Sequence, residues 1–365
     1  MRRLRVLVVE DSLTVRRRLV EVLALDPELD LVGEAVDGKQ AIERCLALRP
    51  DVITMDMMLP GMTGLSATEY IMAHCPTPIL IVSSSTNRGE LFRTYEALAA
   101  GAVDVLEKPR GDEPEGVWED KFLTTLKMVA RIRVITHLRG RLRPATGSVT
   151  AGPVDSASRG DGELGVRRPY ALIAIGASTG GPGAIVEILR TLPSNFAVPI
   201  LLVLHIGEPF GTAFADWLDG QTSRRVSFAV DGQPLQGLGG RVVMAPPDQH
   251  LSIAEGRLRL SRGDERFSCR PSVDVLFEAV ARSCGNTAVG CLLTGMGRDG
   301  AAGLLEIRQA GGMTIAQDEV TSVVYGMPRE AVLLGAAQRG LPLQDIGRTL
   351  AQLTSATDTR PPDSP

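Results

Sequence analysis

Short apolar runs that alternate with helical segments restrict the fold of this chain more than any other feature. Segments with helical periodicity, such as 13–25, separate the apolar runs of the first 110 residues, which lie at 4–9, 29–35, 52–55, 79–82 and 103–106. Strands separated by helices of this length pair in parallel, because a parallel connection needs a crossover and a helix supplies it. The pattern predicts a parallel sheet with helices on both faces and ligands beyond the carboxyl ends of its strands.

Charged and hydroxyl side chains lie at those strand ends. Glu10 and Asp11 follow the first strand, Asp56 the third, Ser83 the fourth and Lys108 the fifth. Three carboxylates at one place repel each other unless a cation lies among them, and all-oxygen ligands suit Mg²⁺. Such a site can bring a phosphoryl group to one carboxylate while the metal and the lysine neutralise its charge. The alternative is that each acid only caps the helix that follows it.

These residues resemble those of a two-component receiver domain. Asp56 begins the stretch Asp-Met-Met-Leu-Pro-Gly-Met-Thr-Gly, and Lys108 is followed by Pro109. The resemblance implies a flavodoxin-like (βα)5 fold for residues 1–125, with Asp56 phosphorylated by a chemotaxis histidine kinase. It further implies a set of ligands and phosphoryl contacts: Mg²⁺ held by Glu10, Asp11 and Asp56, and the phosphoryl group contacted by Ser83 and Lys108.

One position departs from the receiver pattern. Val105 stands three residues before Lys108, where receivers often carry an aromatic residue that couples to the strand hydroxyl. Without that aromatic side chain, the switch is expected to act through the loop backbone and the contact between domains.

A segment of different composition joins the two halves of the chain. A helix is expected at 119–138, and residues 144–169 are rich in Gly, Ser, Ala, Pro and Asp, which is typical of a linker. We therefore expect a helical extension and flexible linker at 126–168, a second domain at 169–354 and a disordered tail at 355–365. A flexible tether of about 26 residues spans roughly 25–30 Å, which would allow the first domain to cover the second and to move away.

The second half begins with a strand that breaks sharply into a helix. The apolar run 171–175 ends at a turn of small residues, Gly-Ala-Ser-Thr-Gly-Gly-Pro at 176–182, and 184–189 has helical periodicity. Such a turn offers unpaired N–H groups to an anion, so it either binds a phosphate or presents Ser178 as a nucleophile. The spacing Gly-x-Ser-x-Gly fits a nucleophile elbow, and the glycine spacing of dinucleotide sites is absent. The alternative is that Ser178 only caps the helix.

Two histidines of the second half are candidate bases for Ser178. His205 follows the apolar run 199–204 and would share the carboxyl edge of a parallel sheet with Ser178. His250 lies in an expected hairpin region at 241–260 and is the weaker candidate.

A carboxylate must orient the imidazole of such a base and stabilise its charged form. Asp299 follows the apolar run 289–293, Asp318 follows 313–316, and the two compete for this role. Capping of the next helix is the alternative for Asp299. Because the acid follows the histidine, the order differs from that of α/β-hydrolases, and a different fold is expected.

Four blocks of the second half resemble the catalytic domain of the chemotaxis response-regulator protein-glutamate methylesterase. They are Gly-Ala-Ser-Thr-Gly-Gly at 176–181, Arg-Pro-Ser-Val-Asp-Val-Leu-Phe at 270–277, Leu-Thr-Gly-Met-Gly-Arg-Asp-Gly at 293–300 and Tyr-Gly-Met-Pro-Arg-Glu at 325–330. The sequence departs from the family at 206–209 and at 268–269, which concerns contacts in the substrate groove. The expected fold is a doubly wound, mainly parallel α/β domain with a small β-hairpin.

The resemblance also implies roles for individual residues. Ser178 would be the nucleophile, His205 the general base and Asp299 its orienting partner. The backbone amides of Thr179 and Met296 would stabilise the oxyanion.

By the two resemblances, the chain is expected to be a phosphorylation-activated serine hydrolase. It would demethylate glutamate methyl esters on the cytoplasmic helices of chemoreceptors, releasing methanol, and deamidate receptor glutamines, releasing ammonia. Mg²⁺ would serve phosphorylation, and the esterase chemistry would need no cofactor. Two alternatives are a receiver-gated, non-catalytic output module and a nucleotide-binding oxidoreductase.

Composition restricts the partners and the compartment. A net charge of −4 does not indicate the basic surface that nucleic-acid binding requires. The five cysteines are scattered without a Cys-x-x-Cys pair, so their spacing indicates neither a disulfide framework nor a zinc site. No signal peptide and no apolar run of about 20 residues is recognised, so we expect a cytoplasmic protein without membrane insertion.

Overall fold

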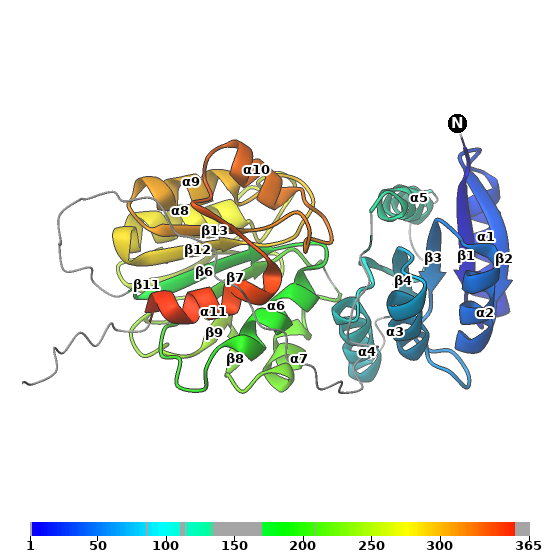
Figure 1. Ribbon diagram of the computed structural model, residues 1–365, viewed down its shortest axis with the longest axis horizontal. Helices are drawn as coiled ribbons and strands as arrows, with labels where there is room; N and C mark the ends of the chain where they lie inside the picture. Colours follow the sequence, from blue (N-terminus) through cyan, green and yellow to red (C-terminus); the bar gives the residue numbers. More distant parts are fainter. Residues whose placement is uncertain are drawn as a thin grey trace, which may run out of the picture.

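The computed structural model describes residues 2–84, 87–109, 114, 116–132, 134, 170–207 and 209–354, which form two α/β domains (Figure 1). The expected linker at 144–169 and the expected tail at 355–365 lie outside the described residues. The described part of the second domain begins at residue 170.

The N-terminal domain alternates strands with helices. Its described elements are β1 (Leu4–Val9), α1 (Leu13–Ala24), β2 (Leu29–Ala35), α2 (Gly38–Leu48), β3 (Val52–Met55), α3 (Gly64–His74), β4 (Ile79–Ser83), α4 (Arg88–Ala99), β5 (Asp104–Glu107) and α5 (Val117–Ala130). The strands pair in the order β2-β1-β3-β4-β5, and every pair is parallel. The predicted flavodoxin-like sheet is confirmed.

Helices pack on both faces of this sheet, as the alternation predicts. Leu19 of α1 and Phe122 of α5 are fully buried in the cluster on one face. Ala41 of α2 and Ile71 of α3 belong to the cluster on the other face.

Helix α5 is shorter than the sequence predicts. It ends at Ala130, whereas helical periodicity suggested an end at residue 138. The N–H of Arg131 bonds to the carbonyl of Met128, three residues back, so the helix closes with a tightened turn there. Residues beyond 134 in that segment are outside the described part of the chain.

The C-terminal domain has a larger sheet. Its described elements are β6 (Leu172–Ala177), α6 (Gly181–Thr191), β7 (Ile200–Leu204), α7 (Phe214–Gln221), β8 (Val226–Phe228), β9 (Val242–Met244), β10 (His250–Ala254), β11 (Arg257–Ser261), α8 (Val273–Cys284), the 3₁₀ helix η2 (Gly285–Thr287), β12 (Ala288–Leu292), α9 (Ala301–Gln309), β13 (Met313–Gln317), α10 (Met327–Leu333), β14 (Arg339–Leu341) and α11 (Leu343–Thr354). The main sheet has the order β14-β13-β12-β6-β7-β9-β8, and its pairs are parallel. The doubly wound, mainly parallel fold is confirmed.

Strand β6 lies where the strand order of this sheet reverses. After β6 the chain adds β7, β8 and β9 on one side, and then β12, β13 and β14 on the other. All six residues of β6 are buried, as expected for a central parallel strand whose two faces are both covered. Doubly wound sheets bind ligands at such a switch point, beyond the carboxyl end of the strand.

The expected hairpin region is only partly a hairpin. Strands β10 and β11 form a separate antiparallel pair. Residues 242–244 instead form β9, which pairs in parallel with β7 and β8 in the main sheet. All three residues of β9 are buried, and that burial makes the strand a member of the core sheet.

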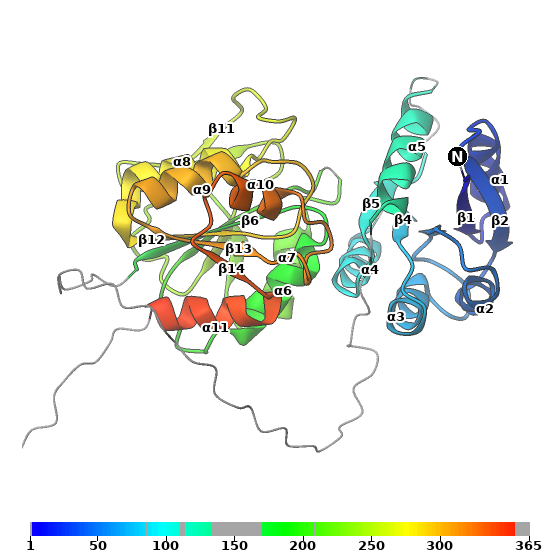
Figure 2. The ribbon, with the colours of Figure 1, turned by 45° about the horizontal axis from the view of Figure 1, so that its top comes forward.

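Two layers of helices cover the main sheet. Helices α6, α7 and α11 pack on one face, with Ile188 and Leu350 among the buried contacts. Helices α8, α9 and α10 pack on the other face, with Phe277 and Leu304 in the core (Figure 2). Among the described residues, none of the helices combines the length and apolarity that crossing a membrane requires.

Helix α4 of the first domain packs against α6 and α7 of the second (Figure 1). Tyr95 is fully buried in the core cluster of the second domain, with its ring 5.2 Å from Phe214 and 5.5 Å from Trp217 between centroids. Its hydroxyl donates a hydrogen bond to the carbonyl of Phe210. A Cβ added at Gly183 of α6 would lie 3.3 Å from the carbonyl oxygen of Ala99, so the two helices approach closely. The domain contact is therefore a packed apolar interface.

Candidate active site

The carboxyl ends of β6 and β7 bring Ser178 and His205 to one edge of the sheet. Ala177 pairs with Leu204 in register, so the residues that follow each strand are neighbours. The backbone N–H of His205 donates to the carbonyl of Ala177 at 3.0 Å. Both side chains line one cavity of about 250 Å³. The predicted meeting of these two residues follows directly from parallel strand pairing.

A loop after β12 approaches the same strand end. The N–H of Ser178 donates to the carbonyl of Thr294 at 3.0 Å. A Cβ added at Gly295 would lie 2.7 Å from the Cβ of Ser178, so only glycine allows this approach. The backbone N–H groups of Thr179 and Met296 donate to no acceptor among the described residues. Two unpaired amides near Ser178 are the arrangement that an oxyanion hole requires.

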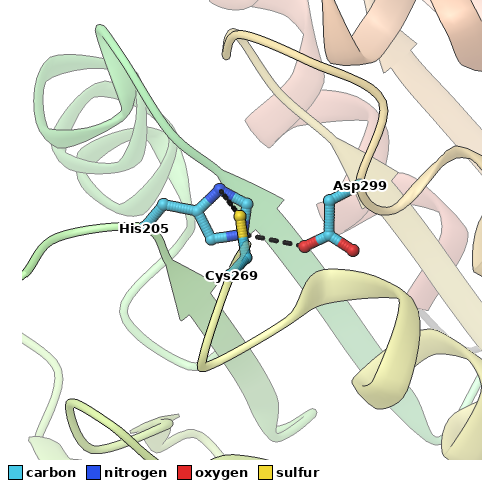
Figure 3. Close-up of side chains that lie close together, drawn as sticks. All are labelled: His205, Cys269 and Asp299. Carbon is cyan, nitrogen blue, oxygen red and sulfur yellow. Dashed lines mark hydrogen bonds and ion pairs between the residues drawn. The ribbon is translucent and has the colours of Figure 1, made fainter. Parts of the chain in front are cut away.

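The third candidate, Asp299, contacts the histidine directly. Its Oδ2 lies 2.8 Å from Nε2 of His205 (Figure 3). The carboxylate is 2% exposed and also accepts hydrogen bonds from Ser272 Oγ and from the backbone N–H of Val273, each at 2.7 Å. These donors belong to the cap and first turn of α8, where unpaired N–H groups favour a negative charge.

Asp318, the competing carboxylate, has a different environment. It accepts hydrogen bonds from the backbone N–H and the hydroxyl of Thr321, and so stabilises its own turn after β13. Between the two sequence candidates, the structure brings Asp299 to the imidazole.

Hydrogen bonding and burial act in opposite directions on this pair. Burial alone would raise the pKa of Asp299, but hydrogen bonds from His205, Ser272 and the α8 backbone lower the pKa below its usual value. Burial alone would lower the pKa of His205, but hydrogen bonds with Asp299 and Cys269 raise it to about 9. The described arrangement therefore favours an imidazolium–carboxylate pair.

Sequence reasoning missed a contact of the second ring nitrogen. Nδ1 of His205 lies 3.7 Å from Sγ of Cys269 (Figure 3), and no hydrogen bond joins either ring nitrogen to Ser178 within the described chain. The only sequence signal for this contact was the departure from the family pattern at 268–269. Ser178 and His205 are thus adjacent but not hydrogen-bonded in this arrangement.

His250, the weaker candidate base, is a structural residue. Its side chain is buried, Nδ1 accepts from the backbone N–H of Ser272 at 3.1 Å, and Nε2 lies 3.0 Å from the carbonyl of Asp264. Both ring nitrogens are occupied by backbone groups, so His250 supports the turn before α8.

Comparison with known proteins identifies the families of both domains. Residues 173–350 match CheB methylesterase, and residues 6–114 match the response regulator receiver domain. The chain is 42% identical over 354 residues to protein-glutamate methylesterase/protein-glutamine glutaminase 2 of Anaeromyxobacter dehalogenans, covering 97% of this chain and 98% of the relative. The chain belongs to the CheB methylesterase family.

Other relatives and solved structures cover the same two parts. Protein-glutamate methylesterase/protein-glutamine glutaminase 4 of Myxococcus xanthus is 41% identical over 356 residues, covering 97% of each chain. The crystal structure of the Thermotoga maritima CheB methylesterase catalytic domain is 35% identical and covers 50% of this chain and 98% of that one, with a TM-score of 0.48. The response regulator domain of Thermotoga maritima CheB is 37% identical and covers 36% of this chain and 99% of that one, with a TM-score of 0.33. None of these relatives favours the oxidoreductase or non-catalytic alternatives.

In this CheB-family chain, the receiver carries the expected acidic cluster. Ligand oxygens of Glu10, Asp11 and Asp56 lie within 4.8 Å of one another. Lys108 Nζ lies 2.9 Å from a carboxylate oxygen of Glu10 and 2.9 Å from one of Asp56. Burial, followed by the charge of Asp56, raises the pKa of Glu10 to about 7, and burial also raises the pKa of Asp56. Because a divalent cation would relieve this repulsion with oxygen ligands, the residues fit Mg²⁺.

The hydroxyl of Ser83 is hydrogen-bonded to the start of α4. It donates to Oε1 of Glu90 at 3.0 Å, and the N–H of Ser84 donates to the same oxygen at 3.0 Å. Glu90 lies in the first turn of α4, the helix that contacts the methylesterase domain. The predicted contact of Ser83 with a phosphoryl group remains a prediction.

The receiver forms one wall of the cavity that contains Ser178 and His205. Receiver residues of that wall include Asp104, Val105, Glu107 and Lys121. Burial raises the pKa of Asp104 to about 6. In this arrangement the receiver lies over the candidate active site.

Proposed function

We propose that this chain is a phosphorylation-activated protein-glutamate methylesterase of chemotaxis adaptation. It hydrolyses glutamyl γ-methyl esters on the cytoplasmic helices of methylated chemoreceptors and releases methanol. The observation that carries the proposal is the His205–Asp299 pair beside Ser178 at the switch point of the sheet. A hydroxyl, an imidazole and a buried carboxylate at one edge of a sheet are the components of a serine hydrolase.

In the proposed mechanism, Ser178 is the nucleophile and His205 the general base. Nε2 donates to Asp299, so the proton of the serine hydroxyl goes to Nδ1. The imidazole must be neutral and must release Cys269 before it can accept that proton. Asp299 keeps the ring oriented and stabilises the imidazolium that forms.

The acyl chemistry then proceeds in two steps. The oxygen of Ser178 attacks the ester carbonyl, and the backbone N–H groups of Thr179 and Met296 stabilise the oxyanion. The proton held by His205 passes to the leaving methoxide, which departs as methanol. Water, deprotonated by the same histidine, then hydrolyses the acyl-enzyme. A glutamine side chain follows the same path with ammonia as the leaving group, which is the proposed glutaminase activity.

Phosphorylation of the receiver controls access to the site. A chemotaxis histidine kinase is the proposed phosphodonor for Asp56, and Glu10, Asp11 and Asp56 would hold the Mg²⁺ that neutralises phosphoryl charge during transfer. A receptor helix is about 10–12 Å wide, and the receiver residues on one wall of the cavity would obstruct its approach to Ser178. Phosphorylation is therefore proposed to shift the population toward an arrangement in which α4 leaves the methylesterase domain. With these proposed partners, the proposed location of the protein is the cytoplasm.

The decisive experiment is methanol release from methylated receptor membranes, with and without a small-molecule phosphodonor. Ser178→Ala should lower the rate by about 10⁴–10⁶-fold, because residues of a triad act as a unit. Asp56 phosphorylation should be unchanged in that variant. Ser227→Ala, at an exposed serine of β8, is the matched control and should behave as wild type. Methanol release at the wild-type rate from Ser178→Ala would exclude the serine mechanism.

A further inference from the structure

The contact between His205 and Cys269 places two metal-binding atoms side by side at the active site. Nδ1 and Sγ are 3.7 Å apart, and a carboxylate oxygen of Asp299 completes a set of nitrogen, sulfur and oxygen atoms within 4.8 Å of one another (Figure 3). His205 and Cys269 are 64 residues apart in sequence, so cysteine spacing gave no sign of this pair.

We propose that His205 and Cys269 bind a thiophilic divalent cation of the Zn²⁺ class, and that the bound cation blocks the esterase. Zn²⁺ binds imidazole nitrogen at about 2.0–2.1 Å and thiolate sulfur at about 2.3 Å, which at a tetrahedral angle separates the two ligand atoms by about 3.6 Å. The observed separation of 3.7 Å is close to this value.

Asp299 supports the site from the other side of the ring. It lies 2.8 Å from Nε2, a distance too short for a metal between the two atoms, so it acts on the histidine and not as a ligand. Metal-binding histidines usually donate their other N–H to a carboxylate, which fixes the tautomer and the ring orientation. The hydrogen bonds from Ser272 and Val273 hold that carboxylate in place. Nδ1 is thereby the ring nitrogen on the side of the thiol.

A tight turn holds Cys269 in this position. Arg266 and Cys269 exchange two backbone hydrogen bonds, at 2.9 and 3.2 Å. Between them, Phe267 and Ser268 have positive φ angles of 50° and 59°, a conformation that most residues avoid. The guanidinium of Arg298 lies 4.3 Å from the ring centroid of Phe267. A strained, braced turn at this point preorganises the sulfur for binding.

Binding would remove the base from the proposed reaction. The thiol of Cys269 and Nδ1 of the imidazolium each lose a proton to solvent, and the sulfur and Nδ1 then each donate an electron pair to the cation. Nδ1 can no longer accept the proton of Ser178. Water in the adjacent cavity of about 250 Å³ can fill the remaining coordination positions. Mg²⁺ prefers oxygen ligands, so the receiver cation does not compete for this site.

Binding is tested first by optical titration of the untagged full-length chain with Co²⁺, which gives thiolate-to-cobalt charge-transfer absorption when sulfur is a ligand. The band should appear in wild type and in Cys284→Ser, the matched control at another partly buried thiol, and should disappear in Cys269→Ser. Cys45 and Cys75 are 0% and 4% exposed and are present in all three proteins, so they are not expected to add a band. A band that persists in Cys269→Ser, or no band in wild type, overturns the proposed site.

Inhibition is tested second and rests on the proposed esterase function. Methanol release is measured over a series of buffered Zn²⁺ concentrations, with each variant normalised to its own rate in chelator. The half-inhibiting Zn²⁺ concentration should be at least about tenfold higher for Cys269→Ser than for wild type and Cys284→Ser, because even outer-shell changes weaken metal sites 10–100-fold. Equal inhibition of all three proteins overturns the proposed blockade. Because the Co²⁺ band does not require turnover, failure of the esterase proposal and failure of the metal site are distinguishable.

Discussion

Replacing Tyr95 with alanine should activate the unphosphorylated enzyme. The ring is fully buried against Phe214 and Trp217 of the methylesterase domain, and its hydroxyl bonds to the carbonyl of Phe210. Truncation of a buried aromatic side chain costs about 3–5 kcal/mol. Because the lost contacts lie between the domains, this cost falls on the closed arrangement.

The size of the effect follows from that cost. A loss of about 3 kcal/mol raises the open-to-closed ratio by roughly 100-fold, since each 1.4 kcal/mol is a factor of ten. The rate without phosphodonor should rise by up to that factor, with the fully open enzyme as the ceiling. Tyr95→Phe removes only the hydrogen bond, worth about 1 kcal/mol, and should raise the rate roughly fivefold. The exposed ion pair between Arg88 and Asp216 adds little to the interface.

The assay is methanol release from methylated receptor membranes, before and after addition of a phosphodonor. Stimulation by the phosphodonor should shrink as the basal rate rises, in the order wild type, Tyr95→Phe, Tyr95→Ala. Tyr70→Ala, at an exposed tyrosine of α3, is the matched control and should keep the wild-type basal rate. A Tyr95→Ala protein that melts cooperatively and yet retains the wild-type basal rate would refute the idea that the receiver inhibits by covering the site.

Three further predictions concern the catalytic residues. Asp299→Asn should lower kcat by about 10³–10⁴-fold while the protein stays folded, because the imidazole loses its charged partner; kinetics with a folding check by circular dichroism tests this. Burial lowers the pKa of His205, but hydrogen bonds with Asp299 and Cys269 outweigh burial and raise the pKa to about 9. The basal rate in metal-free buffer should therefore increase as the pH rises through that value, where the neutral base forms. Cys269→Ala removes one of the raising contacts, so the midpoint of its pH–rate profile should move to lower pH; an unchanged midpoint would contradict this assignment. Gly295→Ala would place a Cβ 2.3 Å from Sδ of the buried Met327 and 2.7 Å from the Cβ of Ser178, and the displaced serine should lose roughly 100-fold in kcat.

Much of the architecture was predictable because parallel strands leave strong local signals. The run that became β6 is apolar throughout because both of its faces are covered, and it ends at residues small enough for a sharp turn. Once β6 and β7 are taken as parallel neighbours, Ser178 and His205 must share an edge. Their proximity required no knowledge of side-chain packing.

The choice between Asp299 and Asp318 was beyond local pattern. Both follow strands of the same sheet, and only the packing of α8 distinguishes them. Ser272 and Val273, at the start of α8, supply the hydrogen bonds that bury Asp299 as a carboxylate. That helix starts 26 residues before Asp299, so no window of sequence contains both partners.

Two features were missed because the local sequence gave too weak a signal for them. The strand at 242–244 was grouped with the hairpin because the residues after it alternate in the manner of a hairpin, and its three-residue length gave too little pattern to assign it to the core sheet. The contact of Cys269 with the imidazole depends on a turn with positive φ angles at Phe267 and Ser268. Phe and Ser are not the residue types that indicate such a turn in a sequence, so the turn was not predicted.

Helix α4 contacts both Ser83 of the receiver and the methylesterase domain. Glu90 in its first turn accepts a hydrogen bond from the hydroxyl of Ser83. Tyr95, little more than one turn further along the helix, is buried in the core of the methylesterase domain. Tyr95 of this helix is the aromatic anchor of the domain contact, away from the acidic pocket that receivers share. A receiver borrowed from another signalling pathway would accept phosphate through the same chemistry, yet without an aromatic anchor at that position it would leave the esterase constitutively uncovered. A few interface side chains can therefore keep parallel sensory pathways in one cell separate, because they decide which receiver covers the esterase, without any change to the phosphorylation site.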